Sequence, residues 1–177
     1  MGKVYTEIDD KLAKTILDQH VFFVATAPLG LEGNINLSPK GLDSFRILGP
    51  TTVAYLDVIG SGVELKENGR IVLMFCMFEG TPNVIRLHGR GRVVEAHWPE
   101  FSKLSAQFPV YESTRALIIV ELTRISDSCG FGVPLLKYEG ERDQHFSWAQ
   151  KKGRDGLRTY KQEKNRRSID GLPGLAE

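Results

Sequence analysis

The chain has 177 residues, of which 41% are apolar, so it can bury one substantial core but is too short for two ordinary domains. Its 23 basic and 22 acidic residues give a formal net charge of +1, which supplies no broad positive field of the kind that nucleic-acid binders carry. We therefore expect no nucleic-acid partner, and any anion site has to be local.

The sequence contains no apolar signal core and no apolar run long enough to cross a bilayer. Cys76 and Cys129 have no close neighbour with which to form a metal-ligand pair, and His88 has no second histidine nearby. We expect a cytoplasmic protein without a membrane partner, with two free thiols and no metal site.

The predicted elements begin with a helix. Apolar residues from Ile8 to Leu17 recur at helical spacing, and Thr6 followed by Asp9 offers an N-terminal cap. Shorter helices are expected at 63–68, which Gly69 closes, and at 99–107.

Strands are predicted wherever short runs of β-branched and aromatic residues stand between turn residues. Such runs occupy residues 21–27, 34–38, 51–57, 70–78, 84–96 and 116–125. A row of short strands with few helices favours a closed antiparallel arrangement, because closure removes exposed strand edges. We therefore predict a mainly β fold, a β-barrel with a few flanking helices, over residues 1–138.

Residues 139–177 form a polar C-terminal extension with isolated aromatics such as Phe146, Trp148 and Tyr160. The extension has too few apolar residues for a core of its own. It is either disordered or docked on the barrel or on a partner subunit, and Trp148 together with the apolar residues of 169–175 favours docking.

Three polar side chains in segment 34–41 (NINLSPKG) share one face of an extended chain, because Asn36, Ser38 and Lys40 are spaced by two. The Ser38 hydroxyl and the Lys40 ammonium suit a phosphate group, and Gly41 lets the backbone approach a ligand closely. The alternative is a polar outer face that ends in an exposed turn.

A second candidate begins where the strand that contains Asp57 ends in Gly60, Ser61 and Gly62 before a short helix. Free backbone N–H groups at such a helix start bind anions. Ser61 either adds a hydroxyl to that site or caps the helix. The familiar nucleotide loops are excluded, because no Walker lysine and no Gly-x-Gly-x-x-Gly follows a strand.

A third candidate is segment 83–93, where Arg86, His88, Arg90 and Arg92 share one face if the strand is regular. Four such groups on one face require anions or solvent. This face is either a solvated barrel exterior or brings Arg86 to a ligand. No Gly-x-Ser-x-Gly nucleophile motif occurs, so hydrolase chemistry is not expected.

The order of these segments resembles the FMN-binding split-barrel proteins related to pyridoxamine 5′-phosphate oxidase. The resemblance covers roughly residues 9–94: helix, strand, segment 34–41, the strand with residues 57–62, and then RLHG at 86–89. Further on, segment 128–134 (SCGFGVP) resembles a glycine-rich segment found in one branch of that family.

The resemblance implies an antiparallel split barrel, a homodimer with two FMN sites at the subunit interface, and oxidoreductase activity of unknown substrate and without a named catalytic residue. The matched anchors for the flavin are Ser38, Lys40, Ser61 and Gly62. Further implied contacts are Asn36, Gly41, Asp57, Arg86 and, from the other subunit, Trp148.

Two departures limit what the resemblance carries over. Residues 156–177 contain no histidine, so the arginine and histidine clamp with which true oxidases hold their substrate is absent. The strand that ends at Asp57 lacks the basic residues that grip the phosphate, so Lys40 and Arg86 are expected to neutralise it. Two alternatives to an FMN-dependent oxidoreductase stay open. One is a non-catalytic flavin- or haem-binding protein, and the other is a deazaflavin-dependent reductase on the same barrel.

Overall fold

The computed structural model describes residues 2–28, 30–60 and 68–176. Within them the strands are β1 (Val4–Tyr5), β2 (Phe22–Thr26), β3 (Asn36–Lys40), β4 (Phe45–Gly49), β5 (Thr52–Val58), β6 (Arg70–Cys76), β7 (Asn83–Glu95) and β8 (Thr114–Cys129). The helices are α1 (Asp10–Leu17), α2 (Pro99–Ser105) and α3 (Gln144–Lys164).

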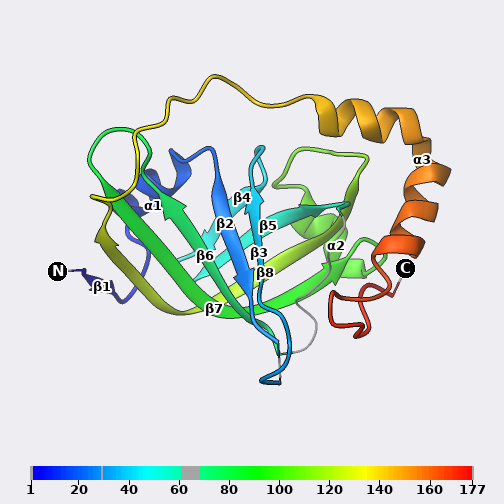
Figure 1. Cartoon of the computed structure of the whole chain (residues 1–177), viewed down its shortest axis with the longest axis horizontal. Coiled ribbons are helices and arrows are strands. Elements are labelled where there is room, and N and C mark those ends of the chain that lie inside the picture. The colour runs from blue at the N-terminus through cyan, green and yellow to red at the C-terminus, as the bar shows by residue number, and fades with distance from the viewer. Residues whose placement is uncertain (1, 29, 61–67, 177) are drawn as a thin grey trace.

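The described strands form one sheet in the order β3-β2-β6-β7-β8-β5-β4, with β1 paired to β8. Every pairing is antiparallel, and the sheet curls around its own interior (Figure 1). The spatial order begins and ends with β3 and β4, although these strands are consecutive in the chain. The gap between the two edges is the split of the barrel, and the predicted antiparallel split-barrel fold is confirmed.

Alternate residues of β8 serve two separate cores. Ala116, Ile118 and Val120 face the barrel interior, whereas Leu117 and Ile119 pack in a second cluster with Phe101 and Leu104 of α2. Because successive side chains of a strand point to opposite faces, a strand covered on both sides reads as a continuous apolar run. This explains why the sequence of β8 does not alternate.

Helix α1 closes one end of the barrel. Asp9 caps it by accepting a hydrogen bond from the Leu12 N–H at 2.8 Å. Leu12 and Ile16 are buried in the main core, and each such side chain contributes about 1.5 to 3 kcal/mol by leaving water. The predicted helix is confirmed, and of the two possible caps the structure uses Asp9.

Three elements were not anticipated: the two-residue β1, the strand β4 and the long helix α3. In Figure 1 the segment after β8 arches over the top of the sheet before α3 begins. Helix α3 changes direction at Gly153, whose φ of 64° and ψ of 174° are not helical. The expected helix at 99–107 is present as α2, and the one expected at 63–68 lies outside the described residues.

The C-terminal segment contacts the barrel of its own chain. Ala149 and Leu157 of α3 form a buried cluster with Ile59, which follows β5.

Both cysteines are free, Cys76 buried and Cys129 exposed. The helices in the described ranges are all too short or too polar to cross a bilayer. The same ranges contain no group of three or more potential metal ligands.

Candidate functional site

A cavity of about 360 Å³ lies between β3 on one side and β5 and β8 on the other. Its volume falls in the range of roughly 300 to 1,000 Å³ that is usual for small-molecule sites. One part of the wall is polar and another is apolar. The polar part contains Thr26, Asn36, Ser38, Lys40, Ser44, Asp57 and Arg115, and the apolar part contains Val24, Tyr55, Ile59, Val93, Ile118 and Leu175.

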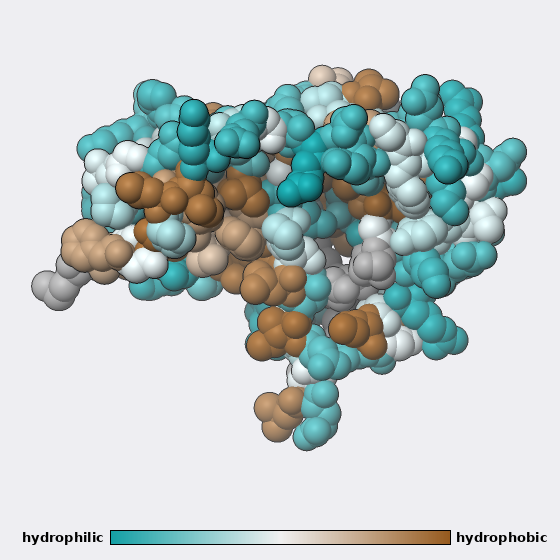
Figure 2. All heavy atoms as spheres, turned by 45° about the horizontal axis from the view of Figure 1, so that its top comes forward, coloured by the Kyte–Doolittle hydropathy of each residue, from teal (hydrophilic) through white to brown (hydrophobic). Residues whose placement is uncertain are grey.

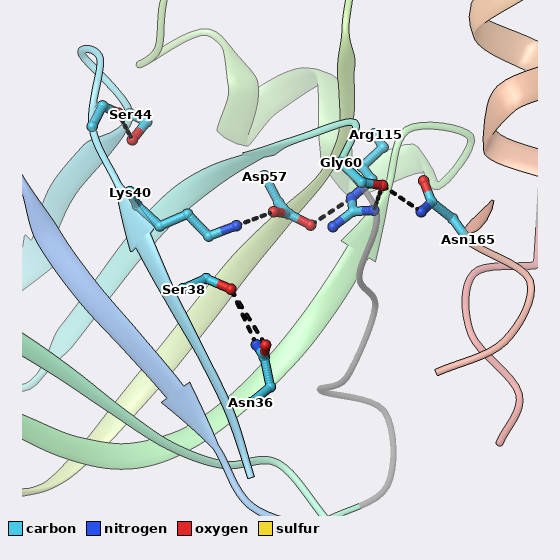
Figure 3. A network of polar contacts seen from close by, with 9 residues as sticks. Asn36, Ser38, Lys40, Ser44, Asp57, Gly60, Arg115 and Asn165 are labelled. Carbon is cyan, nitrogen blue, oxygen red and sulfur yellow. Dashed lines mark hydrogen bonds and ion pairs between the residues drawn. The ribbon is translucent and has the colours of Figure 1, made fainter. Parts of the chain in front are cut away.

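Two cations hold one buried carboxylate at this cavity. The Lys40 Nζ lies 3.0 Å from Asp57 Oδ1, and the Arg115 Nε lies 2.7 Å from Asp57 Oδ2. The two basic side chains approach Asp57 from opposite sides, Lys40 from β3 and Arg115 from β8 (Figure 3). The Lys40 side chain retains 23% of its exposure, whereas Arg115 retains 5%. Lys40 is therefore the more accessible cation.

The charge state of Asp57 follows from this pairing. Burial raises its pKa, but the attraction of Arg115 and Lys40, together with their hydrogen bonds, outweighs burial and holds the pKa below its ordinary value. Asp57 is thus a carboxylate at neutral pH. An ionised acid with two cationic partners is tolerated in a buried position, whereas an unpaired one would not be.

A β-bulge positions Arg115. Asp57 is paired with Ala116 and Val58 is paired with Thr114, so Arg115 is the extra residue on β8 at that point. A bulge re-aims the side chain of its extra residue. Here the guanidinium reaches Asp57 and also lies 3.4 Å from the Gly60 carbonyl oxygen.

The polar face predicted on segment 34–41 is observed. Asn36, Ser38 and Lys40 line the cavity, whereas Leu37 is exposed outside its lining and the exposed Pro39 contributes to the wall. The Asn36 amide lies within hydrogen-bonding distance of Ser38 Oγ, at 3.3 Å. This contact is long, which leaves both side chains free to turn toward a ligand.

The loop after β3 has an unusual backbone. Gly41 lines the cavity, and its carbonyl oxygen accepts a hydrogen bond from Ser44 Oγ at 2.6 Å. Leu42, also in the cavity wall, has a φ of 60°, which a non-glycine residue adopts only at an energetic cost. Strain of this kind concentrates at functional sites.

Thr26 contributes a polar group that has no partner among the described residues. Thr26 is 6% exposed and lines the cavity, but its Oγ1 makes no hydrogen bond to any residue that the structure describes. Thr26 stands opposite Asn36 in the β2–β3 pair. Because a buried hydroxyl without a partner is costly, this atom fits a site whose ligand donates or accepts a hydrogen bond here.

The structure brings together five of the nine residues predicted to hold a flavin: Asn36, Ser38, Lys40, Gly41 and Asp57. Ser61 and Gly62 lie outside the described residues. The expected flavin roles of all nine remain predictions.

Arg86 and Trp148 are not brought to this cavity. Arg86 points away from the interior that Ile85 and Leu87 fill, and its Nη1 donates to Ser128 Oγ at 2.8 Å. Trp148 packs beside Ile59 and against the Tyr160 ring, with 5.2 Å between ring centroids.

Sequence reasoning missed Arg115, Thr26 and Leu175. Within the described residues of this chain, Arg115 and not Arg86 lines the cavity beside Lys40. A lone arginine directly before the apolar run that begins at Ala116 was the available signal. Thr26 and Leu175 carried none, because a threonine in a strand and a leucine near the terminus are unremarkable.

The fold and the site define this chain as an antiparallel split-barrel protein with a partly polar cavity between β3 on one side and β5 and β8 on the other. No family model matches the sequence. The pyridoxamine 5′-phosphate oxidase family protein ustO of Aspergillus flavus is 38% identical in an alignment of 192 positions that covers 97% of this chain and 77% of that protein. The chain therefore belongs to the pyridoxamine 5′-phosphate oxidase family, as the resemblance predicted.

Solved structures give the same fold. A candidate pyridoxamine 5′-phosphate oxidase from Lactobacillus delbrueckii aligns with a TM-score of 0.54 at 15% identity, covering 70% of this chain and 98% of that one. HupZ of Group A Streptococcus aligns with a TM-score of 0.52 at 22% identity, covering 67% and 91%.

Proposed function

We propose that the cavity binds a flavin, with FMN as the cofactor, and that the protein is an oxidoreductase that works as a homodimer in the cytoplasm. The observation that carries the proposal is that one cavity contains both an accessible ammonium, Lys40, and a buried hydroxyl, Thr26, that has no hydrogen-bond partner in the described part of the chain. Family membership supports the same cofactor class.

Lys40 suits a phosphate despite its ion pair with Asp57. An ammonium has three N–H donors, and the Asp57 contact at 3.0 Å uses one of them. Arg115 holds the other carboxylate oxygen, so Asp57 keeps a counter-ion when Lys40 turns toward a ligand. The hydroxyl of Ser38 and the amide of Asn36 stand on the same face of β3 and complete a set of donors for phosphate oxygens.

The remaining wall suits an aromatic ring system. Tyr55, Val93 and Ile118 are buried, and they keep water away from the inner part of the cavity. When it is bound, the flavin supplies the electron-transfer chemistry, and the protein sets its orientation and access. None of the described cavity residues is assigned as a general acid or base.

Exposed apolar side chains support a homodimer. Figure 2 shows apolar atoms at the surface along the projecting β2–β3 hairpin, where Ile35 and Leu37 are 72% and 63% exposed. Phe131 and Leu135, in the segment that arches toward α3, are also exposed. Apolar surface of this kind marks sites of association, and a second copy of the chain is the partner expected for this family.

Cofactor extraction tests the function. Protein purified under native conditions is denatured, and the released chromophore is identified by absorption and mass spectrometry. FMN is the expected result. Haem, a deazaflavin, or protein that neither carries nor takes up flavin would contradict the proposal. Light scattering tests the assembly, and a monomer that holds flavin at micromolar concentration would contradict the shared-site homodimer.

A further inference from the structure

The residues after α3 form a closed clip, which we call the C-terminal strap (165–176). The Leu175 N–H donates to the Asn165 carbonyl oxygen at 2.9 Å, and the Gly174 N–H donates to the Arg166 carbonyl oxygen at 2.9 Å. A Cβ at position 174 would lie 2.3 Å from the Asn165 carbonyl oxygen, so this close approach requires glycine. The strap is therefore an ordered element rather than a free tail.

On one side of the split, the strap is anchored by buried groups. Asn165, 1% exposed, donates from Nδ2 to the Gly60 carbonyl oxygen at 2.7 Å, directly after β5. The Ala176 N–H donates to both carboxylate oxygens of Glu95, at 3.2 and 3.0 Å, and Glu95 on β7 is 2% exposed. Buried hydrogen bonds to a carboxylate are the stronger kind, so this end of the strap is firmly held.

On the other side, the strap contacts the hairpin that leads into β3. The Asp170 carboxylate accepts a hydrogen bond from the Asn34 backbone N–H at 2.9 Å and one from Asn34 Nδ2 at 2.7 Å. These contacts are exposed to solvent. The strap thus joins the hairpin of the β3 edge to the β5 and β7 side, and between these contacts Leu175 enters the main core and the cavity wall.

We infer that the C-terminal strap is a wall of the flavin cavity supplied by the same chain, with Leu175 shaping the cavity and the Asp170–Asn34 contact acting as its latch. The inference rests on the proposed flavin site. The exposed latch costs less to break than the buried contacts of Asn165 and Glu95. Cofactor release therefore begins at Asp170 while the strap stays attached at its other side.

The test is the rate of FMN release from the full-length chain carrying Asp170→Ala. Loss of two hydrogen bonds to a carboxylate is expected to speed FMN dissociation about tenfold, measured by the recovery of flavin fluorescence after dilution. The matched control is Asp155→Ala, which removes a carboxylate with a 94% exposed side chain on α3. Release from Asp170→Ala at the rate of the control would overturn the inference.

Amide hydrogen exchange gives a readout that does not depend on cofactor chemistry. The amides of Leu175 and Ala176 are expected to exchange more slowly when FMN is bound, and Asp170→Ala is expected to reduce that protection. Equal exchange with and without FMN would exclude the strap as a cavity wall. If the parent chain binds no FMN, the proposed function fails, whereas parental binding with an unchanged release rate in Asp170→Ala defeats only the strap.

Leu175→Ala and Leu175→Met separate shape from folding. Leu175 is 5% exposed in the main core, so alanine leaves a void there, while methionine conserves the volume. We expect weaker FMN binding in the alanine variant and restoration by methionine. Parental FMN affinity in a folded alanine variant would contradict the role of Leu175.

Discussion

The Lys40 ammonium and the Asp57 carboxylate, 3.0 Å apart, join β3 to β5 across the split of the barrel. The two strands are separated by most of the sheet in its hydrogen-bonded order, since β3 begins that order and β5 comes next to last. Because β3 and β5 are not neighbours in this order, the ion pair connects two strands that are not hydrogen-bonded to each other in the described sheet. The proposed anionic ligand would bind at the same place.

Replacing Lys40 by alanine is expected to weaken FMN binding about tenfold or more, because a hydrogen bond to a charged group contributes about 1.5 to 3 kcal/mol. The loss should be larger at low salt. Riboflavin, which lacks the phosphate, should bind parent and variant almost equally. Both affinities are measured by flavin fluorescence, with Lys14→Ala, an exposed lysine of α1, as the control. Equal losses for FMN and riboflavin would show that Lys40 only supports the fold.

The Asp57 ion pairs predict a dependence of stability on pH. Because the pKa of Asp57 is lowered in the folded state, its stabilising effect is complete above the unfolded value of about 3.9 and is lost as the pH falls toward the folded value. Asp57→Asn should cost about 3 kcal/mol near neutral pH by leaving buried cations without their carboxylate. Urea unfolding should show this difference shrinking below about pH 4. A difference that stays constant with pH would contradict the ionised state.

Two glycines of α3 should respond in opposite ways to alanine. Gly153 has a φ of 64° and a ψ of 174°, a conformation nearly restricted to glycine, so Gly153→Ala should destabilise by about 1 to 3 kcal/mol. Gly156 lies in the helix, where an added Cβ meets only the Lys152 side chain at 3.4 Å. Gly156→Ala should therefore stabilise by up to about 1 kcal/mol. Urea unfolding of both variants gives the comparison, and a loss of similar size in both would contradict the kink.

The contact of α3 with the barrel should weaken in mild acid. His145 Nε2 lies 2.7 Å from Oγ of the buried Ser113, and burial lowers the pKa of His145. A histidine with a lowered folded pKa stabilises the fold above its unfolded value of about 6.5, and that contribution is lost as the pH falls from there toward the folded value. Urea unfolding between pH 8 and pH 5 should show a smaller pH dependence in His145→Gln than in the parent. Identical pH profiles would contradict this role.

Local patterns in the sequence were sufficient to predict one wall of the cavity, the polar face of β3. The spacing of Asn36, Ser38 and Lys40 predicts a shared face because the two-residue period of a strand depends only on neighbouring residues. The helix at the N-terminus and most strands were predictable for the same reason. The strand β4 was missed because its five residues, FRILG, include the charged Arg46 and end in Gly49, which leaves only a short apolar pattern.

The rest of the site depends on contacts between distant residues. Arg115 reaches Asp57 from 58 positions away, through a bulge that shifts the β5–β8 register, and no local pattern encodes such a shift. Helix α3, with two internal glycines and many charges, has weak intrinsic helical preference, and its Ala149 and Leu157 are buried only against the barrel. Leu175 enters the cavity wall only because Asn165 and Glu95 anchor the strap.

The position of β8 has a consequence for how the chain folds. This strand lies between β7 and β5 and also pairs with β1, yet it comes after all the other described strands in the chain. Until residues 114–129 have left the ribosome, β5 lacks its β8 neighbour and β7 has an open edge, and pairings over such separations form slowly. The nascent chain thus carries apolar strands with unpaired edges until β8 emerges, and its barrel can close only after residue 129 has been translated.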